Sequence, residues 1–400
     1  MEIKEPGMRK KSLVFRFVSL QIVCLCIMTS FGSFAIAYLK DVRGVSDGTV
    51  GTLLMLMTIG AFTGNFLFGR LCDYFHTHKR VFFLSCALIV PTGMALYASP
   101  NITAIYVLYI LFGFVQAPIA VVLDTWIIGT FTGNPGVYGK IRAAGALSYA
   151  VSSVVYGRLL NTYGYGIIPF ALGGTVLVGV LIASTIPDSR EAIQPKSEGR
   201  GSAKRLLNAP LVLFLACLLM TGTCGSVYQF LPVMMGRVGG SLGTLGLALS
   251  SSGVAQMPFM FFSDRLRHIP PRVRISISGM IYIVMSLCFA FGPSPAFLVA
   301  GALISGGAYG LLLPATRELV GELSPPEMRT TAQGLADSVF LSLSGIVSSG
   351  TIGALSGSLG MRGVILGIAT MQAVGVILLL ILHKRSRANC HMQVKCETVA

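Results

Sequence analysis

The sequence predicts an all-α integral membrane protein with twelve transmembrane helices arranged as two bundles of six. Three observations lead to this prediction: the composition, a series of long apolar runs, and the uneven placement of positive charge. Of the 400 residues, 54% are hydrophobic and only 11% are charged, whereas a soluble chain of this length needs about 25% charged residues. Most of the protein surface is therefore expected to face lipid.

Twelve apolar runs are long enough to cross a membrane. A transmembrane helix needs about 20 mainly apolar residues, and short breaks such as Pro100-Asn101 and Pro293-Ser294-Pro295 mark tight turns between neighbouring runs. The predicted spans are 14–38, 48–69, 81–99, 102–128, 138–160, 165–187, 209–235, 243–263, 274–292, 295–316, 331–356 and 361–383.

The lysines and arginines fix the expected orientation, because cytoplasmic loops carry an excess of these residues. With a cytoplasmic N-terminus, most of the 30 lysines and arginines lie in cytoplasmic segments. The loops on the other side then hold only Lys40, Arg43, Arg158, Arg237 and Arg362. We therefore predict that both termini are cytoplasmic. The net charge of +15 then needs no nucleic-acid partner, since there is no basic domain for DNA to dock on.

The longest polar stretch divides the chain into two halves of six predicted spans, whose sequences resemble each other weakly. Residues 188–208 are rich in Pro, Ser, Gly and basic residues, which is typical of a flexible linker. We predict an N-terminal bundle over 1–187, a cytoplasmic linker over 188–208, a C-terminal bundle over 209–383 and a cytoplasmic tail over 384–400. Six-helix repeats of this kind are a transporter architecture that holds its solute between the halves, near the middle of the membrane.

Other function classes lack their sequence features. The chain has no HExxH pattern, no CxxC pair and no Walker loop, which disfavours a metalloenzyme, a metal or disulfide framework and an ATP-driven pump. We expect no cofactor and no metal. A channel usually needs an oligomeric pore, whereas a duplicated twelve-helix chain forms its pathway alone, so a monomer is expected.

The loop between the second and third spans carries the most specific local pattern. Gly69 and Arg70 are followed by Asp73 and then by the basic pair Lys79-Arg80. This pattern resembles the signature loop of the major facilitator superfamily, which implies a role for these five residues as a latch on the cytoplasmic side. Asp73 is also placed to cap a helix N-terminus.

A carboxylate and a guanidinium form the second pattern. Asp124 in the fourth span and Arg142 in the fifth lie nine residues before and nine after Gly133, the centre of the turn between the spans. An antiparallel hairpin then places them at the same depth, where each charge favours the other or a wet cavity. A structural ion pair near the inner membrane face, with Tyr149 in the interface belt, is the alternative.

The sequence around Arg142 resembles the lactose permease-like, oligosaccharide:proton symporter group, which includes nucleoside:proton symporters. The resemblance implies that Asp124, Arg142 and Tyr149 bind the solute. Gln256-Met257-Pro258-Phe259 and Arg329-Thr330-Thr331-Ala332-Gln333-Gly334-Leu335 resemble further patterns of the group. Gln256 stands where relatives often have Glu, and we include it among the solute-binding residues.

The carboxylate that would carry a proton has no clear counterpart in this chain. Only Asp124 and Asp337 lie within predicted spans away from a loop. Asp124 has a cationic partner, whereas no residue in the helix of Asp337 pairs with it. Asp337 is therefore the favoured proton-coupling residue, with Asp124 as the second. A solvated or hydrogen-bonded Asp337 without this role is the alternative.

Together these features predict a secondary transporter that takes up a small polar solute, such as a sugar, oligosaccharide or nucleoside, by proton symport. An efflux antiporter or a uniporter for another organic solute is the alternative within the class. The helix from Ala143 to Gly157 lacks the proline of many drug antiporters, which favours uptake. A membrane-embedded enzyme or a receptor is the alternative from another class.

Overall fold

The computed structural model describes residues 6–131, 135–188, 208–325 and 328–397. Contacts between Cα atoms divide the chain into two compact units. The first unit comprises Met1–Ser197 and Pro232–Val254, and the second comprises Glu198–Leu231 and Ala255–Ala400. Most of the predicted linker 188–208 lies outside the described residues, so the predicted division into two bundles stays a prediction.

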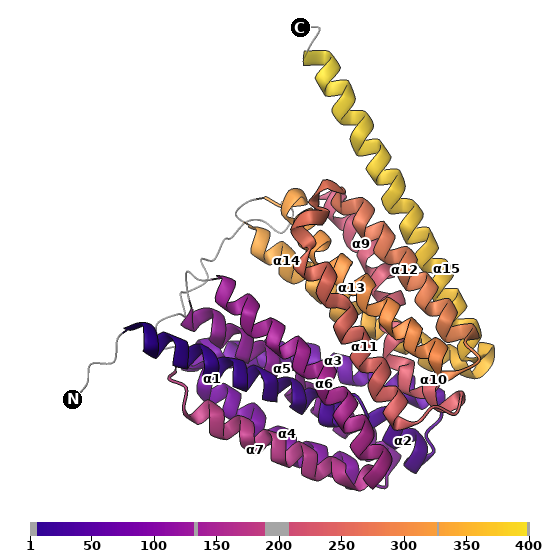
Figure 1. The fold of residues 1–400 in the computed structure, drawn as a ribbon. Helices are drawn as coiled ribbons and strands as arrows, with labels where there is room; N and C mark the ends of the chain where they lie inside the picture. Colours follow the sequence, from indigo (N-terminus) through magenta and orange to yellow (C-terminus); the bar gives the residue numbers. More distant parts are fainter. Residues whose placement is uncertain (1–5, 132–134, 189–207, 326–327, 398–400) are drawn as a thin grey trace. The chain divides into compact units, whose positions relative to one another are not determined.

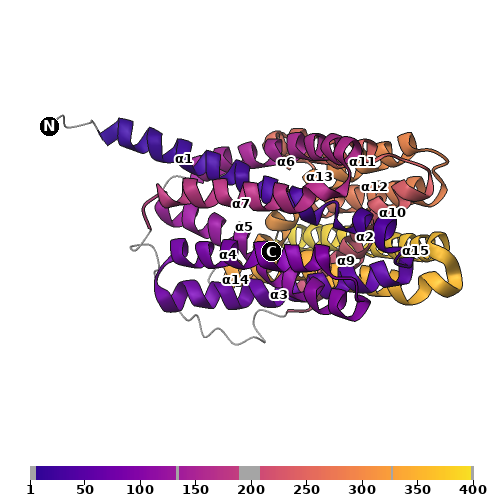
Figure 2. The same cartoon turned by 90° about the horizontal axis from the view of Figure 1, so that it is seen from below.

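The helices of the first unit follow the predicted spans closely. α3 packs on α5, α4 packs on α5 and α7, and α1 packs on α6 and α7 (Figures 1 and 2). The helices of this unit are α1 (Pro6–Ile27), α2 (Ala35–Arg43), α3 (Asp47–Phe75), α4 (His78–Ala98), α5 (Ile102–Thr130), α6 (Pro135–Tyr163) and α7 (Ile168–Ser184), with α10 (Leu231–Arg237) and most of α11 (Leu242–Phe261).

The second unit is built around α12 and α13. α12 packs on α13 and on α15, and α15 also packs on α9. The helices of this unit are α9 (Ala209–Gly225), α12 (Pro271–Phe291), α13 (Pro295–Leu323), α14 (Arg329–Asp337) and α15 (Ser344–Glu397). α15 contains a sharp break at Gly360, where φ is 68°.

The structure confirms the predicted all-α membrane fold, and its helices can be matched to the twelve predicted spans. In the described part of the chain, nine helical segments are long and apolar enough to cross a membrane. One of them, Thr331–Lys384, contains the last two predicted spans, separated by the break at Gly360. The remaining two spans are α6 and α11, which are helices of 29 and 20 residues with more small and polar side chains.

Several spans are not regular α-helices throughout; the seventh contains a 3-10 segment at Ser226–Phe230 between α9 and α10, and two others contain π-helical segments. The first span contains a π-helical segment at Met28–Gly32 between α1 and α2, and the eleventh contains one at Ser338–Leu343 between α14 and α15. Each π segment displaces the hydrogen-bond ladder by one residue and re-aims the side chains that follow it. The apolar pattern of the sequence predicts neither segment.

Glycines allow α3 and α5 to approach each other closely. A Cβ atom built on Gly60 would lie 2.1 Å from the backbone oxygen of Ile110, and one built on Gly64 would lie 2.1 Å from that of Phe114. On the facing helix, Gly113 meets the backbone oxygen of Met57 in the same way. The small-residue face of the second span, formed by Gly60 and Gly64, is therefore its contact surface with α5.

We expect Gly60→Ala to destabilise the first unit by about 1–3 kcal/mol, since the added methyl group meets backbone that cannot move aside. Gly174→Ala in α7 is the matched control, because a Cβ there meets no atom within 4 Å. Thermal unfolding of the purified variants measures the difference. Equal stabilities of the two variants would contradict the tight crossing.

Candidate solute-binding site

The central element of the site is the ion pair between α5 and α6. Nη1 of Arg142 donates to Oδ2 of Asp124 at 2.6 Å, so the predicted contact across the hairpin is present. The side chain of Asp124 is 21% exposed and that of Arg142 is 52% exposed. The pair is therefore open to a ligand, although its role in binding stays a prediction.

Tyrosines flank this ion pair along α6. Tyr138, one turn before Arg142, hydrogen-bonds to the Asp124 carboxyl group. Tyr149 follows Arg142 by two turns, or about 10 Å along the helix axis. The Tyr149 ring lies against α11, because a Cβ built on Gly253 would be 3.5 Å from its Cδ1.

The π segment of the first span faces the same side of α6. The Ser152 hydroxyl donates to Oγ1 of Thr29 at 3.0 Å, and Tyr149 hydrogen-bonds to Ser33. The hydroxyls of Ser152 and Ser153 also donate to the backbone oxygen of Tyr149. These contacts add hydroxyl groups to the site. Sequence reasoning missed them because the π segment re-aims side chains that an α-helical pattern places elsewhere.

Gln21 on α1 is a second group that sequence reasoning missed. Its side chain is fully buried, and neither its amide nitrogen nor its amide oxygen has a hydrogen-bond partner among the residues that the structure describes. It packs against α6, where a Cβ on Gly145 would lie 2.8 Å from its Cγ. One turn further along α1, Cys24 lies within the electrostatic reach of Asp124 and Arg142. A buried amide without a partner costs free energy, so its retention in this position requires an explanation.

We therefore expect Gln21→Met to raise the free energy of unfolding by about 1–2 kcal/mol, because it removes unpaired polar atoms from the interior. Gln372→Met in α15 is the control: its amide nitrogen donates to Thr221 and only its amide oxygen lacks a partner among the described residues, so this variant should be less stable than Gln21→Met. Chemical unfolding in one detergent compares the two. Destabilisation by Gln21→Met would show that the amide is satisfied.

Gln256 belongs to the second unit, on α11. There α13 approaches α11 closely, since a Cβ on Gly310 would lie 2.5 Å from the backbone oxygen of Gln256. The Gln256 side chain is partly exposed. Its place among the solute-binding residues stays a prediction.

Asp337, also in the second unit, ends α14 directly before the π segment. Its side chain is half-buried, and the positive charge of Arg317 on α13 acts on it. Sequence reasoning considered only the helix of Asp337 itself and found no partner there. The cationic neighbour comes from another helix, which a single-helix argument cannot reveal.

The five residues of the predicted latch lie at the end of α3 and the start of α4. Asp73 is exposed on the last turn of α3, and a Cβ on Gly69 meets no atom within 4 Å. The guanidinium of Arg70 lies 5.7 Å from the centroid of the Phe66 ring. Lys79 donates to two backbone oxygens at the end of α7, and Arg80 is exposed.

Asp188 is the carboxylate that accepts hydrogen bonds at the N-terminus of α4. Its oxygens accept from the Thr77 hydroxyl at 2.5 Å and from the Lys79 backbone N–H at 3.3 Å. The Thr77 hydroxyl in turn accepts from the Arg80 backbone N–H at 3.2 Å. The cap that the sequence suggested for Asp73 is thus formed here by Thr77 and Asp188. Asp73 does act electrostatically on His78.

Two further charge clusters were not predicted. At the start of α3, Asp47 pairs with both Lys40 and Arg237. In the second unit, Arg274 pairs with Glu318 of α13, and Arg274 is buried with 1% exposure. In each case the partners are far apart in sequence or separated by a turn, so local patterns do not link them.

Comparison with known proteins agrees with this architecture. The family model described as Major Facilitator Superfamily matches residues 18–348 and 238–390. A maltose permease of Geobacillus stearothermophilus is 25% identical over 355 residues, which are 88% of this chain and 89% of the permease. A probable 3-phenylpropionic acid transporter of Escherichia coli is 26% identical over 64% of this chain and 68% of its own length.

A solved structure has the same fold. A point mutant of the nucleoside transporter NupG aligns with a TM-score of 0.80 at 15% identity, covering 92% of this chain and 99% of NupG. The chain belongs to the major facilitator superfamily. It is therefore a multi-pass membrane protein and a secondary transporter rather than an enzyme, as the sequence predicted.

Proposed function

We propose that this transporter takes up a small polar solute of the sugar, oligosaccharide or nucleoside class together with protons. The observation that carries the proposal is the Asp124–Arg142 pair, partly exposed and accompanied by Tyr138 and Tyr149. Similarity to a maltose permease over 88% of the chain supports a sugar, and the fold of NupG is compatible with a nucleoside.

The chemistry of the pair suits such solutes. A guanidinium presents several N–H donors in a planar fork, and a carboxylate accepts from hydroxyl groups, so the pair can bind adjacent hydroxyls of a sugar. The Tyr149 ring offers an apolar face to a pyranose or a base. Neutral polyols satisfy both members, whereas an organic acid would satisfy only Arg142.

The remaining parts of the proposal follow the sequence predictions. Both termini face the cytoplasm, a monomer is the working unit, and Gly69, Arg70, Asp73, Lys79 and Arg80 act as the cytoplasmic latch. The hydrogen bonds of Lys79 to the end of α7 support a loop that is held in a defined position, as a latch requires.

The test is counterflow exchange in proteoliposomes that contain the purified chain. Labelled maltose, lactose, uridine, adenosine and 3-phenylpropionate are supplied against unlabelled solute, and empty liposomes are the control. We expect exchange of a sugar or a nucleoside. Exchange of 3-phenylpropionate alone would contradict the solute class and favour an organic acid transporter.

Proton coupling is tested separately with Asp337→Asn. We expect this variant to keep counterflow exchange but to lose accumulation driven by an inward proton gradient, because the amide cannot carry the proton. Glu322→Gln, an exposed acid on α13, is the control and should still accumulate solute. Undiminished accumulation by Asp337→Asn would exclude this residue as the proton carrier.

A further inference from the structure

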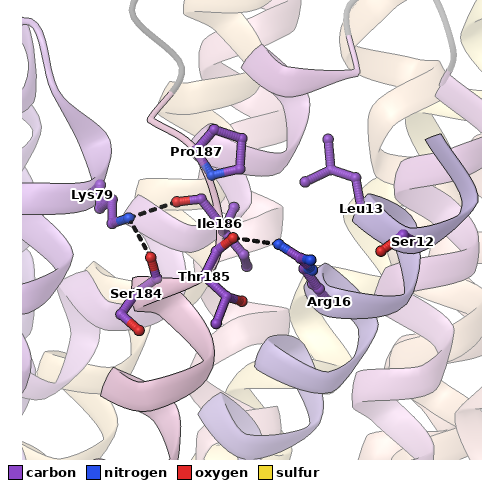
Figure 3. Close-up of a pocket in the computed structure, with 8 residues that line it drawn as sticks. All are labelled: Ser12, Leu13, Arg16, Lys79, Ser184, Thr185, Ile186 and Pro187. Atoms are coloured by element: carbon purple, nitrogen blue, oxygen red, sulfur yellow. Dashed lines mark hydrogen bonds between the residues drawn. The ribbon is translucent and has the colours of Figure 1, made fainter. Parts of the chain in front are cut away.

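A basic cavity lies at one end of the first unit, where α1, α4 and α7 meet (Figure 3). It measures about 460 Å³. Two cationic side chains reach into it from different helices, Arg16 from α1 and Lys79 from α4. Its described lining contains no acidic side chain and consists of Ser12, Leu13, Arg16, Lys79, Ser184, Thr185, Ile186 and Pro187.

The two cations are held in place by carbonyl groups at the C-terminus of α7 and in the two residues that follow it. Nη1 of Arg16 donates to the backbone oxygen of Thr185 at 2.6 Å. Nζ of Lys79 donates to the backbone oxygens of Ser184 and Ile186 at 2.8 and 2.7 Å (Figure 3). These carbonyls end a helix and have no intrahelical donor. They orient the cations, but they carry no full negative charge to neutralise them.

The carboxylate next to the lining in sequence is already engaged. Asp188 follows the lining residue Pro187, and its oxygens accept from the Thr77 hydroxyl and the Lys79 backbone N–H. The side-chain nitrogens of Arg16 and Lys79 donate instead to the carbonyl groups of α7. The cavity therefore presents two fixed positive charges that are complementary to an anion.

An apolar groove lies between α4 and α7, one helical turn from this cavity on each helix. It measures about 600 Å³ and is lined by Phe83, Cys86, Ala87, Val90, Pro91, Gly173, Val176, Leu177 and Val180. Phe83 lies one turn after Lys79 on α4, and Val180 lies one turn before Ser184 on α7. The Lys79 ammonium is 5.9 Å from the centroid of the Phe83 ring, so the charged cavity and the groove adjoin.

Small residues keep the groove open, and a close contact ends it. A Cβ built on Gly173 meets no atom within 4 Å, whereas one built on Gly93 would lie 2.5 Å from Cδ2 of Leu172. The groove therefore runs along Phe83–Pro91 of α4, and the contact between Gly93 and Leu172 closes it just beyond. Along α4 the open length is about 12 Å, which suits part of an extended acyl chain.

We propose that this composite site binds one anionic phospholipid, with its phosphate between Arg16 and Lys79 and one acyl chain along the groove between α4 and α7. A charged head at the end of an apolar groove matches the structure of such a lipid, and basic pockets between transmembrane helices bind anionic headgroups in this way. By the predicted orientation, the lipid belongs to the cytoplasmic leaflet.

Native mass spectrometry of the full purified chain tests the proposal by titration with dioleoyl phosphatidylglycerol and dioleoyl phosphatidylcholine. We expect phosphatidylglycerol to bind more tightly than phosphatidylcholine. Arg16→Gln should weaken phosphatidylglycerol binding by about fivefold, which is the contribution expected from one basic residue near an anionic headgroup. Ser12→Glu introduces a negative charge without removing a cation and should give a comparable loss. Equal affinity of the parent for the two lipids would overturn the proposal.

A second pair of variants tests the groove. Gly173→Phe fills it and should weaken phosphatidylglycerol binding, whereas Gly174→Phe, whose Cβ also has open space but which does not line the groove, should not. Equal effects of the two variants would contradict the acyl-chain part. Glycerol 3-phosphate and inorganic phosphate are the soluble probes. Binding of either as tightly as the lipid would show a site for soluble anions and overturn the assignment to a lipid.

Discussion

Replacement of Arg142 by lysine should abolish solute binding while the protein stays folded. A lysine keeps the positive charge and can still face Asp124, but its ammonium is a point charge and cannot make the forked contacts of a guanidinium. Arg142→Ala should have the same effect. Removing one partner of a hydrogen-bonded charge pair costs about 2–5 kcal/mol, which corresponds to a loss of at least about thirtyfold in affinity.

The matched control for this prediction is Arg158→Lys on the same helix. Arg158 is exposed four turns further along α6, so its replacement should leave affinity unchanged. Isothermal titration with the sugar or nucleoside that exchanges in counterflow measures both variants, and thermal unfolding checks that they are folded. Retained affinity in Arg142→Lys would favour a purely structural ion pair.

Removal of Glu318 should give the largest loss of stability. Arg274 is buried, and its Nε donates to the backbone oxygen of Ile269 at 2.9 Å. Glu318 pairs with it directly, and Glu322 acts on it electrostatically. Breaking a buried pair by removing one partner costs about 3–5 kcal/mol, because the other charge remains buried without compensation. Since the Glu318 side chain is 32% exposed, we expect Glu318→Ala to lie near the lower end of this range.

The double variant Arg274→Met/Glu318→Leu tests whether the loss of stability comes from the charge that is left without a partner. Replacing both members by apolar residues of similar volume is often neutral or stabilising, so the double variant should recover most of the loss. Thermal unfolding of the parent, the two single variants and the double variant completes the cycle. A double variant as unstable as the sum of the single ones would contradict the coupling of the two residues.

The sequence predicts the helices well because apolar length is a local property. Ten of the twelve spans lie in helices that their apolar length alone identifies, whereas α6 and α11 carry more small and polar residues. The break at Gly360 falls between two predicted spans. The Asp124–Arg142 contact could also be predicted, because an antiparallel hairpin brings together residues at equal distances from its turn. Both arguments need only the residues of one or two neighbouring helices.

Contacts between distant segments could not be predicted in this way. Asp188 accepts hydrogen bonds at the N-terminus of α4, although it follows α4 by three helices in the sequence. The charge that acts on Asp337 is Arg317 of α13. The π segment at Met28–Gly32 has no distinctive apolar pattern, yet it decides that Thr29 faces Ser152. A buried amide such as Gln21 is recognisable only when its surroundings are known, because the sequence does not show which face of α1 is covered.

The most direct test of the proposed site is protection of a cysteine placed inside it. Ala146 lies one turn after Arg142 and one turn before Tyr149 on α6, and in a cysteine-free background Ala146→Cys can be alkylated. Leu147→Cys is the control, because Leu147 is exposed on another face of the helix. A saturating concentration of the exchanged sugar or nucleoside should slow alkylation at position 146 and not at 147. Equal alkylation rates at position 146 with and without solute would contradict a binding site at Asp124, Arg142 and Tyr149.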